Sequence, residues 1–77
     1  MKGTQLTLQQ RIGEVVRRHR VSKKWTQEGF ADHIEMHRAQ YGLVERGRKD
    51  LRVSSLERVA QGLEVSVWAI LREAEEE

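Results

Sequence analysis

The fold of this chain is decided by residues 26–47, which read TQEGFADHIEMHRAQYGLVERG. Thr26 can cap a short helix, because its hydroxyl can accept a hydrogen bond from the free amides of the first turn. A turn at residues 35–37 follows, and a second helix then runs to Gly47, a residue that suits the left-handed end of a helix. The stretch therefore predicts two short helices joined by a tight turn.

The second of these helices has an outward face that the core does not need. The side chains expected to point inward from the stretch are Phe30, Ala31, Ile34, Met36, Tyr41 and Val44. Those expected to point outward from the second helix are Arg38, Ala39, Gln40 and Leu43. A helix-turn-helix uses such a face to place its second helix in the major groove of DNA. The stretch therefore predicts a DNA-binding module.

Helical periodicity continues on both sides of residues 26–47. Before them, the stripe that follows the capping Thr7 comprises Leu8, Ile12, Val15, Val16 and His19. After them, a second stripe comprises Leu56, Val59, Ala60 and Leu63, and Ser66 caps a last helix that carries Val67, Trp68, Ile70 and Leu71. We therefore expect an all-α fold of five helices in a single domain spanning residues 1–77, with an ordered core over about residues 7–72 and a frayed acidic end at 73–77.

The composition argues against several other classes of protein. The chain has 77 residues and no cysteine, and its three histidines lack the spacing of zinc ligands, so we expect no disulfide, no metal and no other cofactor. No apolar run approaches the roughly 20 residues that cross a bilayer, which favours a cytoplasmic, nucleoid-associated protein with no membrane partner. A chain this short buries little surface, and forming a homodimer would supplement its stability.

The charge is unevenly distributed along the chain. Residues 1–52 carry 12 Lys and Arg against 6 Asp and Glu, whereas residues 53–77 carry 2 against 6, which together give the net charge of +2. A basic end opposite an acidic one would orient the domain toward a polyanion such as double-stranded DNA. Charge alone also fits an ordinary solvated surface. The prediction of DNA binding therefore depends on the helical stretch.

Four stretches together resemble the lambda-repressor/Cro-like (XRE) helix-turn-helix family. They are TQEGFA at 26–31, VERG at 44–47, IGEVVRRHR at 12–20 and LERVAQGLEV at 56–65. Within that family, HRAQY at 37–41 and DLRV at 50–53 look most like the small controller proteins of restriction–modification systems. The resemblance implies a five-helix lambda-repressor-like DNA-binding domain with the helix-turn-helix in helices two and three.

The family resemblance places the base contacts at the start of helix three. Arg38 can donate to guanine O6 and N7, and Gln40 can pair with an adenine or guanine edge. The apolar Ala39 and Leu43 suit thymine methyl groups. Phosphate contacts need donors, and the expected donors flank the two helices: Gln27, which resembles the family's phosphate-binding glutamine, with His37, Arg46, Arg48 and Lys49. The alternative is a solvated polar helix face.

Two further sets of residues have expected structural roles. By resemblance, Arg20 and Glu45 form a partly buried salt bridge between helix one and the end of helix three, with two exposed charges as the alternative. Symmetric DNA readers need two copies roughly 34 Å apart. We therefore expect a dimer interface on helix five and the connector before helix four, formed by Leu51, Val67, Trp68 and Leu71. Alternatively, Val67 and Leu71 belong to the core and Trp68 covers them.

Three residues depart from the family pattern, and a fourth replaces a leucine. Gly29 and Gly42 lie within helices two and three, where a larger residue is usual, and Gly42 would allow a close approach of the backbone to DNA or to another helix. Glu64 replaces the common glycine after helix four, so the turn there is expected to differ. Trp25 occupies a position that the family fills with leucine, and we expect it in the core.

These observations predict a dimeric, sequence-specific DNA-binding transcriptional regulator that recognises an inverted-repeat operator through helix three. No small-molecule ligand is expected, because the chain has no second domain. The alternative is a protein-interaction module, such as a toxin-neutralising antitoxin, that uses the helix five surface. An enzyme is not expected, because the chain lacks cysteine, paired carboxylates on an apolar face and a phosphate-cradling glycine loop.

Overall fold

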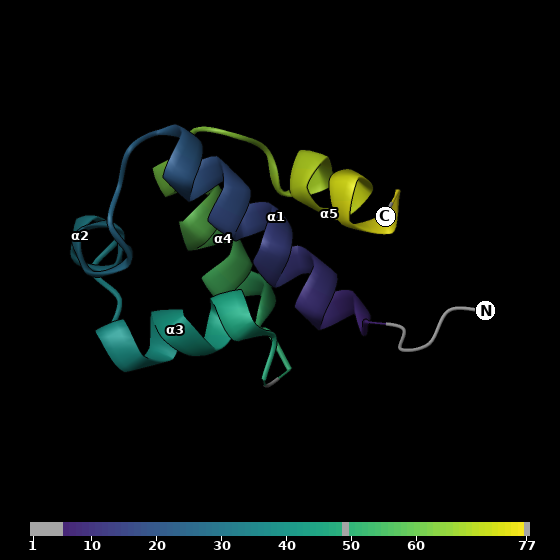
Figure 1. Cartoon of the computed structure of the whole chain (residues 1–77), viewed down its shortest axis with the longest axis horizontal. Helices are drawn as coiled ribbons and strands as arrows, with labels where there is room; N and C mark the ends of the chain where they lie inside the picture. The colour runs from purple at the N-terminus through teal and green to yellow at the C-terminus, as the bar shows by residue number, and fades with distance from the viewer. Residues whose placement is uncertain (1–5, 49, 77) are drawn as a thin grey trace.

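Five helices make up the part of the chain that the structure, a computed structural model, describes: residues 6–48 and 50–76. They are α1 (Leu8–Ser22), α2 (Gln27–His33), α3 (Arg38–Arg46), α4 (Val53–Leu63) and α5 (Val67–Glu75), shown in Figure 1. The described residues contain no strand, so the predicted all-α fold of five helices is confirmed. None of these helices is long and apolar enough to cross a membrane.

Three of the five helices begin at the residue predicted to cap them. The Thr7 hydroxyl accepts a hydrogen bond from the Gln10 amide at 3.1 Å, and the Gln10 side chain accepts one from the Thr7 amide at 2.9 Å. This reciprocal pair is a capping box, which satisfies two free amides at the start of α1. Thr26 and Ser66 likewise accept from the amide three residues on, at 2.9 and 3.0 Å.

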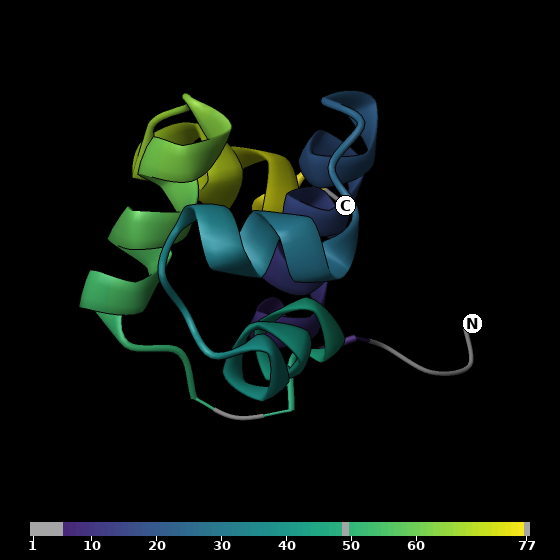
Figure 2. The ribbon, with the colours of Figure 1, turned by 90° about the vertical axis from the view of Figure 1, so that its left-hand side faces the viewer.

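The core forms where α1 packs against α3 and α5, with α2 and α4 closing the remaining sides (Figures 1 and 2). Its buried hydrophobic residues are Ile12, Val15, Val16, Phe30, Ala31, Ile34, Met36, Tyr41, Val44, Leu56, Val59, Ala60, Leu63, Ile70 and Ala74. Leu8 and His19 were expected on the same stripe, but Leu8 is 37% exposed and His19 is half-buried. Leu8 is the first residue of α1, one turn before the first buried position of the stripe, Ile12.

Trp25 packs against the core, as its leucine-like position predicts. Its ring is half-buried and stacks on His33, with the ring centroids 4.5 Å apart. The Trp25 and Phe30 rings also make an edge-to-face contact, with their centroids 6.0 Å apart. The segment between α1 and α2 is thereby anchored, because an aromatic contact of this kind adds to the stabilisation from burial alone.

The end of α5 differs from the predicted frayed tail. The helix continues to Glu75, and Ala74 is fully buried. Arg11 donates through Nε to the Ala74 carbonyl at 2.9 Å, and His19 Nε2 lies 3.1 Å from a Glu73 carboxylate oxygen. The prediction was wrong because it weighed only the acidic composition, whereas Ala74 extends the buried stripe of α5 by one turn.

One close approach between helices occurs at Gly13, a glycine whose role the sequence did not single out. A Cβ at Gly13 in α1 would lie 2.3 Å from the Glu45 carbonyl oxygen of α3. A Cβ at Gly42 would instead meet only the end of the Arg46 side chain, at 3.4 Å, so Gly42 does not serve a close approach to another helix. Glu64 adopts the left-handed conformation (φ 63°) that glycine usually supplies, so the expected difference in that turn is absent.

Candidate nucleic-acid interface

The predicted helix-turn-helix is present as α2, the turn at residues 34–37, and α3. Met36 is buried in this turn, and Glu35 takes a left-handed conformation (φ 58°) that lets the chain change direction. The predicted inward residues Tyr41 and Val44 hold α3 against the core. As a result, α3 lies along one edge of the molecule with its opposite face uncovered (Figures 1 and 2).

The uncovered face of α3 carries the four residues that we expect to read bases. Arg38, Ala39 and Gln40 are exposed in the first turn of the helix, and Leu43 is half-buried one turn further along. The structure therefore brings these four side chains together on one surface. An α-helix with such a surface can enter the major groove, where short polar and apolar side chains reach base edges.

Arg38 is not free on this surface. Its Nη2 and Nε donate to the two carboxylate oxygens of Asp32 in α2, at 2.9 and 3.3 Å. A Glu28 carboxylate oxygen lies 3.6 Å from Arg38 Nη1. The hydrogen bond from Arg38 holds the pKa of Asp32 below its ordinary value, and the same bond raises the pKa of Arg38. The sequence reasoning missed both carboxylates; their i, i+4 spacing on α2, beside the start of α3, is a signal that could have identified them.

A buried charged network lies directly behind the interface. Arg20 in α1 donates to both carboxylate oxygens of Glu45, through Nε at 2.6 Å and through Nη2 at 3.2 Å, so the expected salt bridge is present. Arg20 also donates to the Trp25 carbonyl at 2.8 Å, and the Tyr41 hydroxyl donates to Glu45. The described residues include no buried side-chain polar atom without a partner. The network ties α1, α2 and α3 together.

The pKa values in this network follow from burial and hydrogen bonding. Burial disfavours ionisation of Glu45, but the hydrogen bonds from Arg20, Tyr41 and Gln27 outweigh burial and hold its pKa below the ordinary value. The hydrogen bond to Glu45 raises the pKa of Arg20 against the opposing effect of burial. Burial, helped by the bond to Glu45, raises the pKa of Tyr41. Glu45 is therefore a carboxylate and Tyr41 a neutral phenol at neutral pH.

The residues expected to contact phosphates fall into three groups. Gln27 is exposed, but its amide donates to the Glu45 carboxylate at 3.1 Å, so the structure links it to the buried network. His37 is exposed at the N-cap of α3, and Arg46 and Arg48 are exposed at its other end. Lys49 lies outside the described residues. The described donors therefore flank the exposed face of α3 at both ends.

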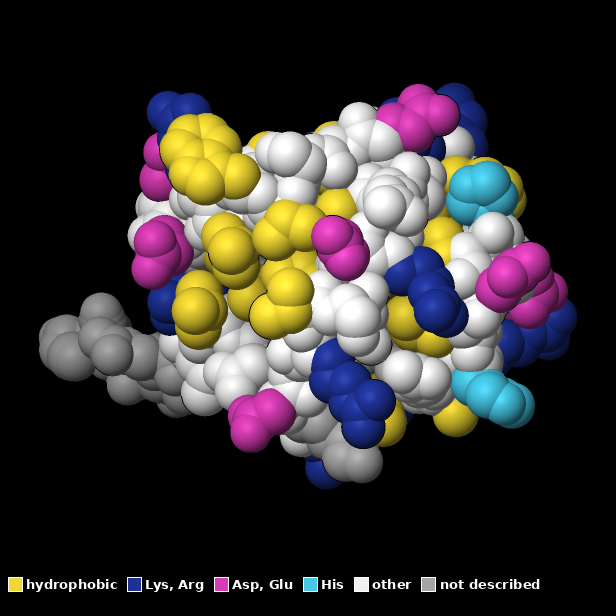
Figure 3. All heavy atoms as spheres, turned by 180° about the vertical axis from the view of Figure 1, so that it is seen from behind, with side chains coloured by type: hydrophobic (Ala, Val, Ile, Leu, Met, Phe, Trp, Pro, Cys, Tyr) yellow, Lys and Arg dark blue, Asp and Glu magenta, His cyan; other side chains and the backbone are white. Residues whose placement is uncertain are grey.

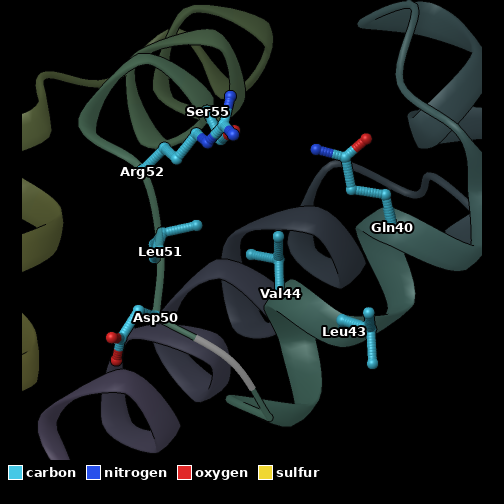
Figure 4. Close-up of a pocket in the computed structure, with 7 residues that line it drawn as sticks. All are labelled: Gln40, Leu43, Val44, Asp50, Leu51, Arg52 and Ser55. Carbon is cyan, nitrogen blue, oxygen red and sulfur yellow. The ribbon is translucent and has the colours of Figure 1, made fainter.

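A groove of about 700 Å³ separates α3 from the connector before α4 (Figure 4). Gln40, Leu43 and Val44 line it from α3, and Asp50, Leu51, Arg52 and Ser55 line it from the other side. Figure 4 shows the Gln40 amide projecting into the groove from α3, with Arg52 at the start of α4 opposite it. Arg52 thus shares a concave surface with two of the base-reading candidates, Gln40 and Leu43.

The residues expected in a dimer interface differ in exposure. Trp68 is 66% exposed, with the Arg72 guanidinium 5.2 Å from its ring centre. Leu51, Val67 and Leu71 are half-buried and packed against the core. Figure 3 shows the molecule from behind, and hydrophobic side chains gather on this rear face. The three aliphatic side chains thus contribute to the core, and Trp68 is the most exposed of the four.

Known proteins resemble the chain in both sequence and structure. A family model described as a helix-turn-helix domain matches residues 11–74. The control protein C.MunI from a Mycoplasma species is 28% identical over 68 residues, which cover 87% of this chain and 92% of that protein. The structure of the clp gene regulator ClgR from C. glutamicum matches with a TM-score of 0.88 and 28% identity, covering 97% of this chain and 96% of that one.

The restriction–modification controller protein C.Esp1396I has been solved as a tetramer in complex with its natural 35 base-pair operator. It matches with a TM-score of 0.81 and 28% identity, covering 95% of this chain and all of that one. These similarities extend over nearly the whole chain, and the family model spans most of it. The chain therefore belongs to the helix-turn-helix domain family, the family type that its sequence resembles.

Proposed function

We propose that this protein is a transcriptional regulator that binds an inverted-repeat operator as a homodimer, with α3 of each copy in the major groove. The observation that carries the proposal is the uncovered first turn of α3, where Arg38, Ala39 and Gln40 are exposed on a helix held from behind by the core. Base readout needs such a rigid support, because a loosely held helix could not keep its side chains in register with base edges.

The relatives support this proposal. ClgR is a regulator of clp genes, and C.Esp1396I was solved on its operator. The chain matches both over almost its full length. Such a regulator acts on double-stranded DNA, and we place it in the cytoplasm with the nucleoid. We propose no catalytic role and no small-molecule ligand for it.

Phosphate contacts complete the proposed DNA complex. His37 at one end of α3, and Arg46 and Arg48 at the other, would bind phosphates on either side of the groove, and the Gln27 amide would join them by exchanging Glu45 for a phosphate oxygen. If each dimer neutralises about six phosphates, raising the salt concentration from 50 to 200 mM would lower its affinity for DNA roughly a thousandfold. The Glu45 contact gives Gln27 a defined position before DNA arrives.

Selection of bound oligonucleotides from a random pool tests the DNA-binding proposal. The selected pool should contain a palindromic site with half-sites one helical turn apart, or a multiple of it. Arg38→Ala and Gln40→Ala should each weaken binding to that site by roughly tenfold or more and relax the preference at one base pair per half-site. The control Glu57→Ala changes an exposed residue on α4 and should leave the selected site unchanged. Equal wild-type affinity for selected and scrambled DNA would reject the proposal.

A dimer through the α5 surface is expected to depend on Trp68. Replacing this 66% exposed residue with serine should weaken dimerisation by roughly tenfold or more, because exposed aromatic anchors dominate interface energies. Sedimentation equilibrium measures the change. Val21→Ser, which alters a 51% exposed residue at the end of α1, is the matched control and should leave the dimer intact. A Trp68→Ser protein that dimerises like wild type would show that the interface lies elsewhere.

The exposed Trp68 also fits a second function, that of an interaction module such as an antitoxin that holds a protein partner. The two functions respond differently to the same variants. Arg38→Ala and Gln40→Ala would abolish regulation that acts through DNA but leave partner binding on α5 unchanged.

A further inference from the structure

Arg38 is the base-reading candidate with the most flexible side chain, and α2 restrains it. Asp32 takes the Nε–Nη2 edge of the Arg38 guanidinium through two hydrogen bonds, at 3.3 and 2.9 Å. A guanidinium has five N–H donors, so this pairing leaves the edge formed by Nη1 and Nη2 available. A guanine accepts two parallel N–H groups at O6 and N7, which is what that remaining edge offers.

Glu28 lies near the Nη1 side of the same guanidinium. Its carboxylate oxygen lies 3.6 Å from Arg38 Nη1, beyond hydrogen-bond distance but close enough to attract. Nη1 belongs to the edge that guanine would use. The two carboxylates therefore have different geometry toward Arg38: Asp32 binds the edge that a base does not need, and Glu28 competes for the edge that a base does need.

We propose that Asp32 is a positioning residue that sets the base specificity of Arg38, whereas Glu28 only opposes DNA binding. The inference rests on the proposed function. All three side chains are more than half exposed, with exposed fractions of 57% for Asp32, 58% for Arg38 and 72% for Glu28. In water such pairs are weak. Once DNA excludes water, the Asp32–Arg38 pair strengthens and keeps the guanidinium in the orientation that guanine accepts.

The same carboxylate penalises wrong sites. At DNA without a guanine in the right place, Arg38 would otherwise turn to a phosphate, a contact that every sequence offers. Asp32 competes with the phosphate for Arg38, and the negative charge of Asp32 is repelled by the phosphates of the DNA backbone. Discrimination thus comes from weaker binding to wrong sequences as well as from tighter binding to the right one.

Asp32→Asn and Glu28→Gln make a matched pair of variants, because each removes one negative charge from α2. Binding to the selected site and to scrambled DNA is measured by fluorescence anisotropy with the full chain. We expect Asp32→Asn to tighten binding to scrambled DNA and to lower the ratio of specific to non-specific affinity by about fivefold or more. Glu28→Gln should tighten binding to both DNAs alike and leave the ratio unchanged or higher. Glu76→Gln, at the Arg72–Glu76 pair of α5 (3.2 Å), should change neither affinity.

Base-resolved selection separates positioning from a merely structural role. Asp32→Asn should relax the preference at the same base pair as Arg38→Ala, with little further loss in the double variant, and Asp32→Glu should restore part of it. Thermal unfolding of each variant should match wild type, because the three side chains are exposed. If Asp32→Asn and Glu28→Gln behave identically, or if Asp32→Asn keeps the full preference, the inference is overturned while the proposed function stands. If wild type itself does not discriminate, the proposed function fails instead.

Discussion

Glu45→Ala is expected to lower the free energy of unfolding by about 3–5 kcal/mol, because it leaves a buried guanidinium without its counter-charge. Arg20 is only 8% exposed, and Glu45 occupies two of its donors. The same substitution also leaves the buried Tyr41 hydroxyl without its acceptor and removes the Glu45 contact of the exposed Gln27 amide. Domains of this size have a total stability near the lower end of about 5–15 kcal/mol, so the variant should retain only about 0–2 kcal/mol.

Urea denaturation followed by circular dichroism measures the loss. Glu76→Ala is the matched control, because it removes the acidic partner of Arg72 at a site where both side chains are at least 60% exposed; it should cost less than about 1 kcal/mol. The double variant Arg20→Met/Glu45→Leu should recover part of the loss, since well-packed apolar residues can replace a buried ion pair. A Glu45→Ala loss no greater than that of Glu76→Ala would contradict the assigned role of the network.

The same carboxylate gives the stability a predictable pH dependence. The pKa of Glu45 is lower in the folded chain than in the unfolded one, so the unfolded state takes up its proton first as the pH falls. Its contribution is therefore complete above the ordinary carboxyl pKa and is lost as the pH falls through the lowered value. Glu45→Gln should flatten the acid limb of a plot of unfolding free energy against pH. An unchanged acid limb would show that other carboxylates set it.

The fold could be predicted from sequence because the apolar residues of each helix recur at helical spacing, which identifies the face that packs inward. Phe30, Tyr41 and Leu63, for example, recur at helical spacing with their neighbours, and all three are fully buried. The end of α5 could not be predicted in the same way, because the acidic composition of residues 73–77 obscured the contribution of Ala74 to the stripe. Helical periodicity predicts burial only if the polar residues between the apolar ones are treated as the exposed face of a helix. The prediction of a frayed end at residues 73–77 instead treats the acidic residues as an unfolded tail.

The candidate site was predictable in its position but not in its internal pairing. The outward face of α3 follows from periodicity alone, since the inward residues fix the remaining ones as exposed. The ion pairs of Arg38 with α2 depend on the angle between two helices, which periodicity does not contain. The role of Gly13 could not be predicted for the same reason. Its close contact is with the α3 backbone, and the local sequence does not encode the distance between two helices.

Gly47→Ala is the second substitution with a large expected effect. Gly47 ends α3 in the left-handed conformation (φ 62°, ψ 35°), where an L side chain costs roughly 1–2 kcal/mol. In addition, a Cβ at this position would lie 2.5 Å from Gln10 Cα and 2.6 Å from Gln10 N, which are backbone atoms of α1. These atoms cannot rotate away, and moving them would disturb the capping box with Thr7. The strain and the overpacking together should cost about 2–5 kcal/mol.

A substitution at Glu64 separates the backbone strain from the overpacking. Glu64 ends α4 in nearly the same conformation as Gly47 (φ 63°, ψ 39°), but with a side chain already present. Glu64→Gly relieves the left-handed strain and also removes an exposed ion pair with Lys23 (3.7 Å, the Glu64 side chain 81% exposed), a pair that contributes little in water. It should therefore raise the unfolding free energy by up to about 1 kcal/mol. The difference between the Gly47→Ala loss and the Glu64→Gly gain, both measured by urea denaturation, is then the cost of pushing α3 away from α1. Equal magnitudes at the two positions would mean that the backbone contact at Gln10 relaxes freely. A larger loss at Gly47 would mean that this glycine fixes the spacing between α1 and the helix proposed to read DNA.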